Sequence, residues 1–205
     1  MILCWYAFLD PLKEDALFEK GLSELIFEER REDILGTKNR EVQIQSLGAG
    51  LLLMHALRQA GVRDCSLTQN PYGKPYLCSK EKYFSLSHTK GIAVCAVSDS
   101  EVGADTEEWM EAKMNLAERF FHPDEILWLN AQADINIAFT RLWTRKESYV
   151  KLIGEGLSRP LDSFCAIESD PSQHMIFHET EVKDYCITVC SGNAEPVLFR
   201  QYRFR

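Results

Sequence analysis

The fold of this 205-residue chain is organised around one segment, Trp143-Thr-Arg-Lys-Glu-Ser-Tyr-Val-Lys151. The segment contains no Gly or Pro and is rich in helix-compatible residues, so it predicts a single helix. At helical spacing Trp143, Glu147 and Lys151 lie on one face, with Lys146 on the neighbouring flank. Such a row could hold a divalent cation and a phosphate side by side. The alternative is a solvated ion pair between Glu147 and Lys151.

Composition limits the kind of partner. The chain is 45% hydrophobic and 26% charged, as in an ordinary globular protein, and its net charge is -8. A general binder of nucleic acids or of anionic membranes needs a basic surface, which this balance does not supply. We therefore expect no nucleic-acid and no membrane partner. Any anionic ligand must be met by a local basic cluster.

The cysteines and the first residues indicate a cytoplasmic protein. The seven cysteines are scattered and include no C-x-x-C pair of the kind found in zinc or redox sites, so we interpret them as reduced core residues. Residues 1–9 are apolar, but they lack a basic start and meet Asp10-Pro11 too early for a signal peptide or a membrane span. They predict a first strand.

Helices are expected to follow this strand. Residues 12–26 show a helical pattern, and the polar residues from Glu28 to Arg40 are typical of a solvated helix face. Val42 to Leu57 is strongly apolar and predicts a core helix, ended by Gly61. His55 within it is interpreted as a packed histidine.

A loop and a hairpin supply the first candidate binding residues. In Asn70-Pro-Tyr-Gly-Lys-Pro75 two prolines restrict the backbone, and Gly73 leaves room for a ligand. Tyr83 to His88 and Gly91 to Val97 predict a hairpin, with Ser85 and Ser87 on one face of its first strand. The hydroxyl-rich, basic turn between the strands suits an anion.

Two carboxylates follow at strand spacing. Val102 to Glu107 predicts a short strand in which Asp105 and Glu107 point to the same face. Carboxylates so placed repel each other unless a cation lies between them, although an acidic strand end is the simpler alternative. Helices are expected at 114–121, at 125–131 and from Ile137 onward. After Gly154, residues 164–167, 175–177, 185–190 and 197–204 alternate like an antiparallel sheet.

Taken together and in this order, five blocks resemble the 4'-phosphopantetheinyl transferases, specifically the long, surfactin-synthetase-activating type. The resemblance runs from about residue 30 to residue 164. Its blocks are Tyr72-Gly-Lys-Pro75, Phe84-Ser-Leu-Ser-His88, Gly103-Ala-Asp-Thr-Glu107, Arg119-Phe-Phe-His-Pro-Asp-Glu125, and the 143–151 segment with the Gly154-Glu-Gly-Leu-Ser-Arg-Pro160 that follows it.

The resemblance implies a fold and a reaction. The fold is α/β (α+β), a pseudo-twofold pair of similar subdomains at 1–100 and 101–205, each with a small, mostly antiparallel sheet packed on helices. The implied enzyme binds coenzyme A in the cleft between them. It transfers the 4'-phosphopantetheine group to a serine of an apo acyl or peptidyl carrier protein and releases adenosine 3',5'-bisphosphate. Mg²⁺, or Mn²⁺ in its place, is the implied cofactor, and we expect a cytoplasmic monomer.

The resemblance also assigns roles to residues. Asp105, Glu107 and Glu147 would hold the metal on the pyrophosphate. Glu147 and Lys151 would be catalytic: Lys151 would be the cation beside the phosphates, and the chemistry of the transfer makes Glu147, directly or through a metal-bound water, the expected base for the serine proton. Arg30 would meet the 3'-phosphate, with Arg31 and Lys38 as alternatives. The residues expected to bind coenzyme A are Arg30, Gly73, Lys74, Pro75, Ser87, His88 and Lys151.

Two departures and two rival functions accompany this prediction. Thr106 stands at a usually aliphatic position and Gln45 where a hydroxyl residue often contacts coenzyme A; neither removes a metal ligand. One rival is a metal-dependent phosphodiesterase or nuclease, which uses a similar set of groups but is disfavoured by the acidic chain. The other is a non-catalytic coenzyme A or carrier-protein binding module, for which three metal carboxylates would be unnecessary.

Overall fold

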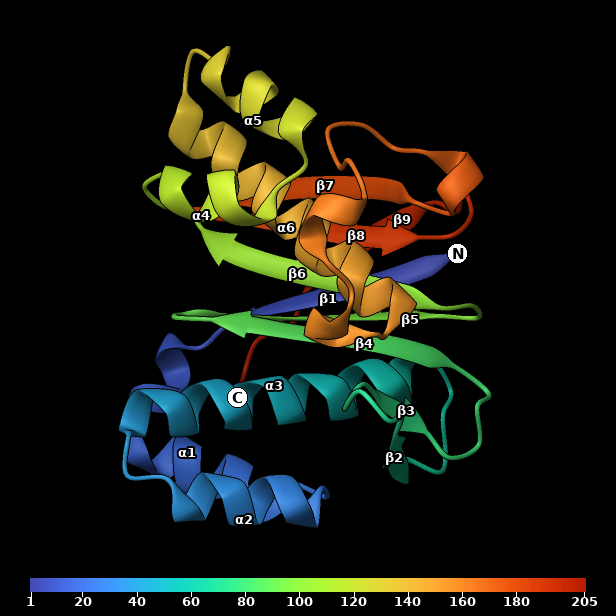
Figure 1. Ribbon diagram of the computed structural model, residues 1–205. Helices are drawn as coiled ribbons and strands as arrows, with labels where there is room; N and C mark the ends of the chain where they lie inside the picture. Colours follow the sequence, from blue (N-terminus) through green and yellow to red (C-terminus); the bar gives the residue numbers. More distant parts are fainter.

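The computed structural model describes the backbone of residues 1–205 and every side chain except that of Leu157. Two sheets lie face to face in the middle of the molecule, with α1–α3 on one side of them and α4–α6 on the other (Figure 1). The elements of the first half are β1 (Ile2–Phe8), α1 (Asp15–Glu24), α2 (Glu28–Gly36), α3 (Arg40–Gln59), β2 (Leu67–Gln69), β3 (Pro75–Leu77), β4 (Tyr83–Thr89) and β5 (Ile92–Ser98).

The second half begins with β6 and contains α6, the helix that includes the 143–151 segment. Its elements are β6 (Val102–Glu108), α4 (Met114–Phe120), α5 (Pro123–Asn130), α6 (Ile135–Ile153), β7 (Ile176–Val182), β8 (Tyr185–Ser191) and β9 (Val197–Gln201). Short 3₁₀ helices are η1 (Asp10–Lys13), η2 (Gly156–Ser158), η3 (Leu161–Ser163) and η4 (Pro171–Gln173).

The first sheet has the order β4-β5-β1-β9, and the second has the order β6-β8-β7. The second sheet is antiparallel throughout, with Asp105 opposite Thr188. In the first sheet β1 is antiparallel to β5, whereas β9 runs parallel to β1 with Phe199 opposite Cys4. Strands β2 and β3 form a separate antiparallel pair.

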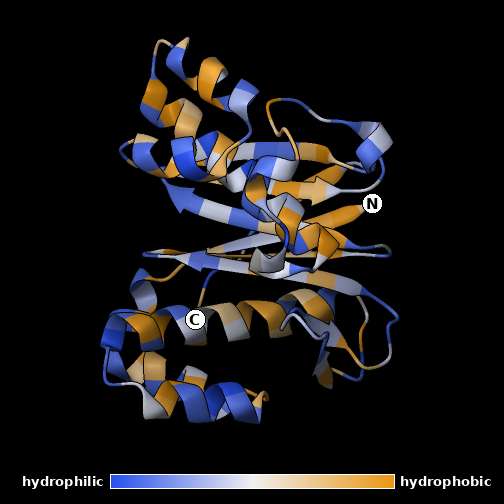
Figure 2. Cartoon of the chain, viewed as in Figure 1, coloured by the Kyte–Doolittle hydropathy of each residue, from blue (hydrophilic) through white to orange (hydrophobic). Residues whose placement is uncertain are grey.

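Hydrophobic residues fill three layers. One core lies between α1–α3 and the first sheet, one lies between the two sheets, and one lies between the second sheet and α4–α6. Figure 2 shows α2 as mainly hydrophilic, and Ile34 is its one buried residue. This agrees with the expected solvated face at Glu28 to Arg40. His55 packs between Trp5 and Tyr202, with ring centroids 4.5 Å and 4.3 Å away.

Side-chain caps define the long helices. Asn39 Oδ1 accepts hydrogen bonds from the amides of Glu41 and Val42 at the start of α3. Asp134 does the same at the start of α6, and Gly154 ends α6 in the left-handed region at φ 78°. The predicted helix through 143–151 is therefore confirmed as the C-terminal half of α6. No helix in the described part of the chain is long and apolar enough to cross a membrane.

Two expectations for the last part of the chain are wrong. Residues 164–167, all of them described, form no strand. Their backbone groups are bonded to side chains instead: Lys146 Nζ donates to Phe164 O at 3.0 Å, and the amide of Ala166 donates to Glu125 at 2.6 Å. A strand needs those groups for ladder pairing.

The strand β9 also differs from the prediction. It does not extend the antiparallel pair β7 and β8, but joins β1 in parallel on the first sheet. Phe204 beyond it belongs to the core under α3. The mixed α/β class is confirmed. The pseudo-twofold division at 1–100 and 101–205 stays a prediction, with the qualification that residues 197–204 pack against the first half.

Candidate functional site

The site is built where β6 passes directly under α6. Gly103 allows this approach, because a Cβ at that position would lie 1.8 Å from the carbonyl oxygen of Ser148 in α6. Asp105 and Glu107 follow on the same face of β6 as Gly103. They therefore meet the face of α6 that carries Glu147 and Lys151.

Lys151 pairs with Asp105 across this contact. Lys151 Nζ donates to Asp105 Oδ1 at 2.6 Å and to Ser87 Oγ at 2.9 Å. Ser87 Oγ, from the hairpin strand β4, donates to the same Asp105 oxygen at 2.7 Å. Among the ion pairs of the described residues, Lys151 is paired with Asp105, and no ion pair joins Lys151 to Glu147. A simple surface pair between Glu147 and Lys151 is therefore not what the structure shows.

The second carboxylate oxygen of Asp105, Oδ2, is buried and has no hydrogen-bond donor among the described residues. Burial first, and then the charge of Asp105, raise the pKa of both Glu107 and Glu147 above the ordinary 4.5. The three carboxylates thus share one region of negative potential. As the side chains lie, no three His, Cys, Asp or Glu residues in the described part of the chain form a group that could hold a metal ion.

A basic cluster adjoins the carboxylates. The pKa of His88 is lowered by loss of solvent and then by the positive charges of Arg30 and Lys151, so these three side chains face a common region. Arg30 reaches it from α2, across α3, where Gly50 makes room: a Cβ on Gly50 would lie 2.8 Å from Arg30 Cδ. Lys38, one of the alternatives to Arg30, is exposed, and the other, Arg31, is half-buried.

A cavity of about 270 Å³ opens on the Lys151 side of the site. Gly73, Pro75 and Phe84 line it from the first half, and Glu147 and Lys151 line it from α6. Gly73 has φ 86°, a conformation that favours glycine. The structure thus brings the 72–75 loop and α6 to the walls of one cavity.

Lys74 also lines this cavity, but its ammonium group is already bonded within the protein. Lys74 Nζ donates to Glu101 Oε2 at 2.7 Å and to Leu152 O at 3.1 Å. Its side chain is only 9% exposed. Desolvation accordingly lowers the pKa of Lys74.

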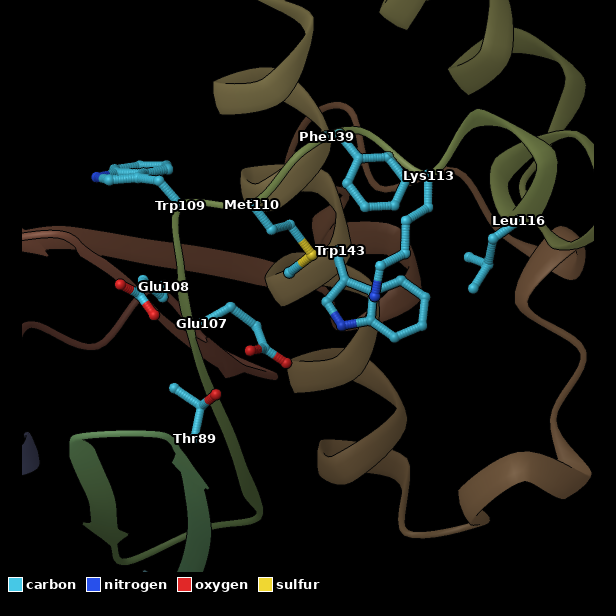
Figure 3. Close-up of a pocket in the computed structure, with 9 residues that line it drawn as sticks. All are labelled: Thr89, Glu107, Glu108, Trp109, Met110, Lys113, Leu116, Phe139 and Trp143. Carbon is cyan, nitrogen blue, oxygen red and sulfur yellow. The ribbon is translucent and has the colours of Figure 1, made fainter. Parts of the chain in front are cut away.

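A second cavity, of about 310 Å³, lies on the Glu107 side. Figure 3 shows Glu107 and Trp143 facing this hollow, with the ring of Trp109 turned away from it. Trp143 stacks on Phe139 with ring centroids 6.3 Å apart and on Phe121 at 6.1 Å. Trp143 therefore packs within an aromatic stack, and Glu107 and Glu147 line two different cavities.

Comparison with known proteins identifies the family. Residues 101–201 match the sequence model of the 4'-phosphopantetheinyl transferase superfamily. A 4'-phosphopantetheinyl transferase of Bacillus subtilis is 34% identical over 197 residues, which cover 86% of this chain and 87% of that protein. The chain belongs to the 4'-phosphopantetheinyl transferase family.

Two further transferases match over shorter lengths. The 4'-phosphopantetheinyl transferase gsp of Aneurinibacillus migulanus is 36% identical over 66% of this chain, but the match spans only 54% of that protein. The 4'-phosphopantetheinyl transferase Sfp of Bacillus subtilis strain 168 is 31% identical over 64% of this chain and 65% of its own length.

In this transferase, sequence reasoning missed the residues that anchor α6 from behind. Lys146 and Glu125 form an ion pair in which both side chains are 0% exposed. Arg145 forms a bidentate ion pair with Glu179: Nε donates to Oε1 at 2.9 Å, and Nη2 donates to Oε2 at 2.7 Å. The signal was present in the 143–151 segment, because the adjacent cations Arg145 and Lys146 cannot both face the same site as Glu147 and Lys151. Arg145 and Lys146 support the helix, while Glu147 and Lys151 face the cavity.

Proposed function

We propose that the chain is a magnesium-dependent transferase that moves 4'-phosphopantetheine from coenzyme A to a serine of an apo acyl or peptidyl carrier protein. The observation that carries this proposal is the contact of β6, which carries Asp105 and Glu107, with the face of α6 that carries Glu147 and Lys151, beside a cavity. Family membership supports the type of transfer. The names of the relatives say nothing of the metal or of the carrier.

The residues present suit a divalent metal. Carboxylate oxygens are hard ligands of the kind that Mg²⁺ prefers, and Asp105 Oδ2 is a buried acceptor in need of a partner. Burial first, and then the charge of Asp105, raise the pKa of Glu107 and Glu147, and a bound cation would oppose both effects. When bound by these three carboxylates, Mg²⁺ would neutralise the pyrophosphate of coenzyme A. Mn²⁺ offers similar chemistry.

The chain's own groups have distinct tasks in the transfer. The serine oxygen forms a bond to the pantetheine-side phosphorus, and the bond from that phosphorus to the bridging oxygen breaks, which releases adenosine 3',5'-bisphosphate. Glu147 accepts the serine proton, a task that a raised pKa favours. Lys151 places positive charge beside the leaving phosphate.

The nucleotide end has its own set of groups. The cavity wall of Gly73, Pro75 and Phe84 is suited to a flat base, since these residues carry no charge and Gly73 has no side chain. Arg30 offers positive charge and His88 a ring N–H donor for phosphate oxygens, whereas Ser87 would have to release Asp105 before its hydroxyl could donate to a phosphate. Of the three candidates for the 3'-phosphate, Arg30 is supported best, because its charge acts on His88.

The decisive experiment is incubation with coenzyme A, magnesium chloride and an apo carrier protein, followed by intact mass measurement of the carrier. We expect the carrier to gain the mass of one phosphopantetheine. Asp105→Ala and Glu107→Ala should each lower the rate on the order of 10²-fold or more, because a ligand of the metal is lost. Glu19→Ala, which removes an exposed carboxylate from α1, is the control. An unmodified carrier, or full activity in both variants, would refute the proposal.

A further inference from the structure

We propose that Lys74 is a positioning residue: together with Asn70 it clasps the C-terminal end of α6 and so holds Lys151 in place, and it is not a phosphate ligand. The inference rests on the proposed function for its activity readout. It gives the Lys74 side chain a role other than the coenzyme A binding that was expected of this residue.

The ammonium of Lys74 bridges the two halves of the chain. One hydrogen bond runs to Glu101 Oε2 at 2.7 Å, just before β6, and the other to Leu152 O at 3.1 Å, in the last turn of α6. To reach a phosphate, Lys74 would have to give up both bonds and leave Glu101 without its partner. A side chain only 9% exposed in this arrangement is committed to the protein.

Asn70 completes the clasp from the same loop. Its Nδ2 donates to Gly154 O at 2.7 Å, while its Oδ1 accepts from the amides of Tyr72 and Lys74 at 2.9 Å each. The loop is packed tightly on the helix end: a Cβ on Gly154 would lie 2.9 Å from Lys74 Cδ. One asparagine therefore shapes the loop and ties it to the helix.

Helix physics explains what the clasp achieves. The last carbonyl groups of a helix lack partners within the helix, and a cation near them is favourable because of the helix dipole. Lys74 and Asn70 satisfy the carbonyls of Leu152 and Gly154, on either side of the helix end. Lys151 lies in this same turn, so fixing the helix end also fixes the ammonium that contacts Asp105.

The clasp also links two walls of one cavity. Gly73 and Pro75, on either side of Lys74 in sequence, line the cavity from the first half, while Glu147 and Lys151 line it from α6. Losing the clasp would let these walls move relative to each other. The catalytic pair would then be misplaced even though no contact with coenzyme A had been removed.

The test compares Lys74→Met, Glu101→Ala and the double variant, with Lys82→Met as the matched control. Lys82 also pairs with an acidic residue of the following segment, Asp99, but at the surface and away from α6. We expect Lys74→Met and Glu101→Ala each to lower kcat by about 10-fold, because misplacement of a catalytic group is costly. The double variant should be no worse than either one, since both break the same clasp.

Two readouts separate positioning from phosphate binding. Amide hydrogen exchange in residues 148–154 should become faster in Lys74→Met and Glu101→Ala but not in Lys82→Met. The preference for coenzyme A over dephospho-coenzyme A, measured as a ratio of KM values, should stay unchanged in Lys74→Met.

Each failure has its own signature. If Lys74→Met abolishes the preference for coenzyme A while Glu101→Ala leaves kcat intact, Lys74 is a phosphate ligand and the inference is wrong. Unchanged exchange in residues 148–154 overturns it as well, whatever the activity. If the wild-type protein modifies no carrier but exchange responds as expected, the proposed function fails and the clasp stands.

Discussion

The tertiary structure gives Lys151 different partners from the one that its sequence neighbours suggest. In the sequence its natural partner is Glu147, one helical turn earlier, whereas in the structure it bonds to Asp105 and Ser87 from two different strands. Glu147 is left beside the cavity with a raised pKa. The two residues therefore have separate tasks, and substitutions should separate them.

Glu147→Gln and Lys151→Met are expected to give different kinetic patterns. Glu147→Gln should lower turnover on the order of 10²-fold and raise the magnesium requirement, because it removes both a ligand and the base. Lys151→Met should weaken coenzyme A binding and turnover together, with magnesium dependence nearly unchanged. Steady-state transfer across a magnesium titration measures both effects.

Thermal melts provide the control for this pair. Lys151→Met leaves the buried Asp105 without its cation and should cost about 1–3 kcal/mol of stability. Trp143→Phe, which keeps most of the aromatic stack, should be mild in both assays. Kinetically silent Glu147 and Lys151 variants would contradict the assignment of α6 to the active site.

His55 should make stability sensitive to mild acid. Burial first, and then the charge of Arg58, lower the pKa of His55 below its ordinary 6.5, and its Nε2 is buried without a described partner. Below pH 6.5 the unfolded chain therefore binds more protons than the folded one, so stability falls as pH falls through that window. Urea unfolding of wild type and His55→Gln from pH 7.5 to 5.5 measures the contribution. Identical pH slopes for the two proteins would contradict it.

At the scale of elements, α6 is held from both sides. Its cavity face meets β6, and its opposite flank carries Lys146, which bonds to Glu125 of α5 and to Phe164 O. Glu125 Oε2 in turn accepts from the amide of His122, where α4 gives way to α5. One buried ion pair therefore joins α5, α6 and the 164–166 segment.

Lys146→Met should be strongly destabilising. It leaves the fully buried Glu125 carboxylate without a cation, and such a loss costs about 3–5 kcal/mol. The double variant Glu125→Leu and Lys146→Met should recover much of this loss, because it buries no charge. Urea unfolding measures all three proteins.

A matched control comes from the same helix. Arg141→Met breaks a more exposed ion pair with Glu181 and should cost less than about 1 kcal/mol. If Lys146→Met is no worse than Arg141→Met, the buried pair does not anchor α6.

At the scale of the whole molecule, the C-terminal segment packs against the N-terminal strand. Strand β9 lies beside β1, and the residues after it add Tyr202 and Phe204 to an aromatic cluster with His55 and Trp5. The first core therefore depends on residues from both ends of the sequence. Substitutions in the C-terminal segment should therefore destabilise the first core.

Phe204→Ala tests this dependence. Phe204 is 8% exposed, and removing its ring should cost about 3 kcal/mol. Leu198→Ala on β9, where the side chain is 38% exposed, should cost less than about 1 kcal/mol. The fluorescence of Trp5 and the melting temperature follow the two variants. Equal, small effects would show that the C-terminal segment is dispensable for the first core.

Local patterns were enough to predict much of the site. The helical period through 143–151 predicted that Glu147 and Lys151 share a face, and the strand period predicted the same for Asp105 and Glu107. The hairpin at 83–97 also follows from short-range rules of backbone geometry. The structure confirms these elements because each depends only on neighbours in the sequence.

Partners were decided by tertiary structure alone. The sequence could not tell that Lys151 bonds to Asp105, that Lys74 bonds to the end of α6, or that Lys146 is buried, because each partner comes from another element. The irregular 164–167 segment and the parallel β9 have the same cause. An alternating pattern states which side chains share a face, but hydrogen-bond competition between distant segments decides what that face meets.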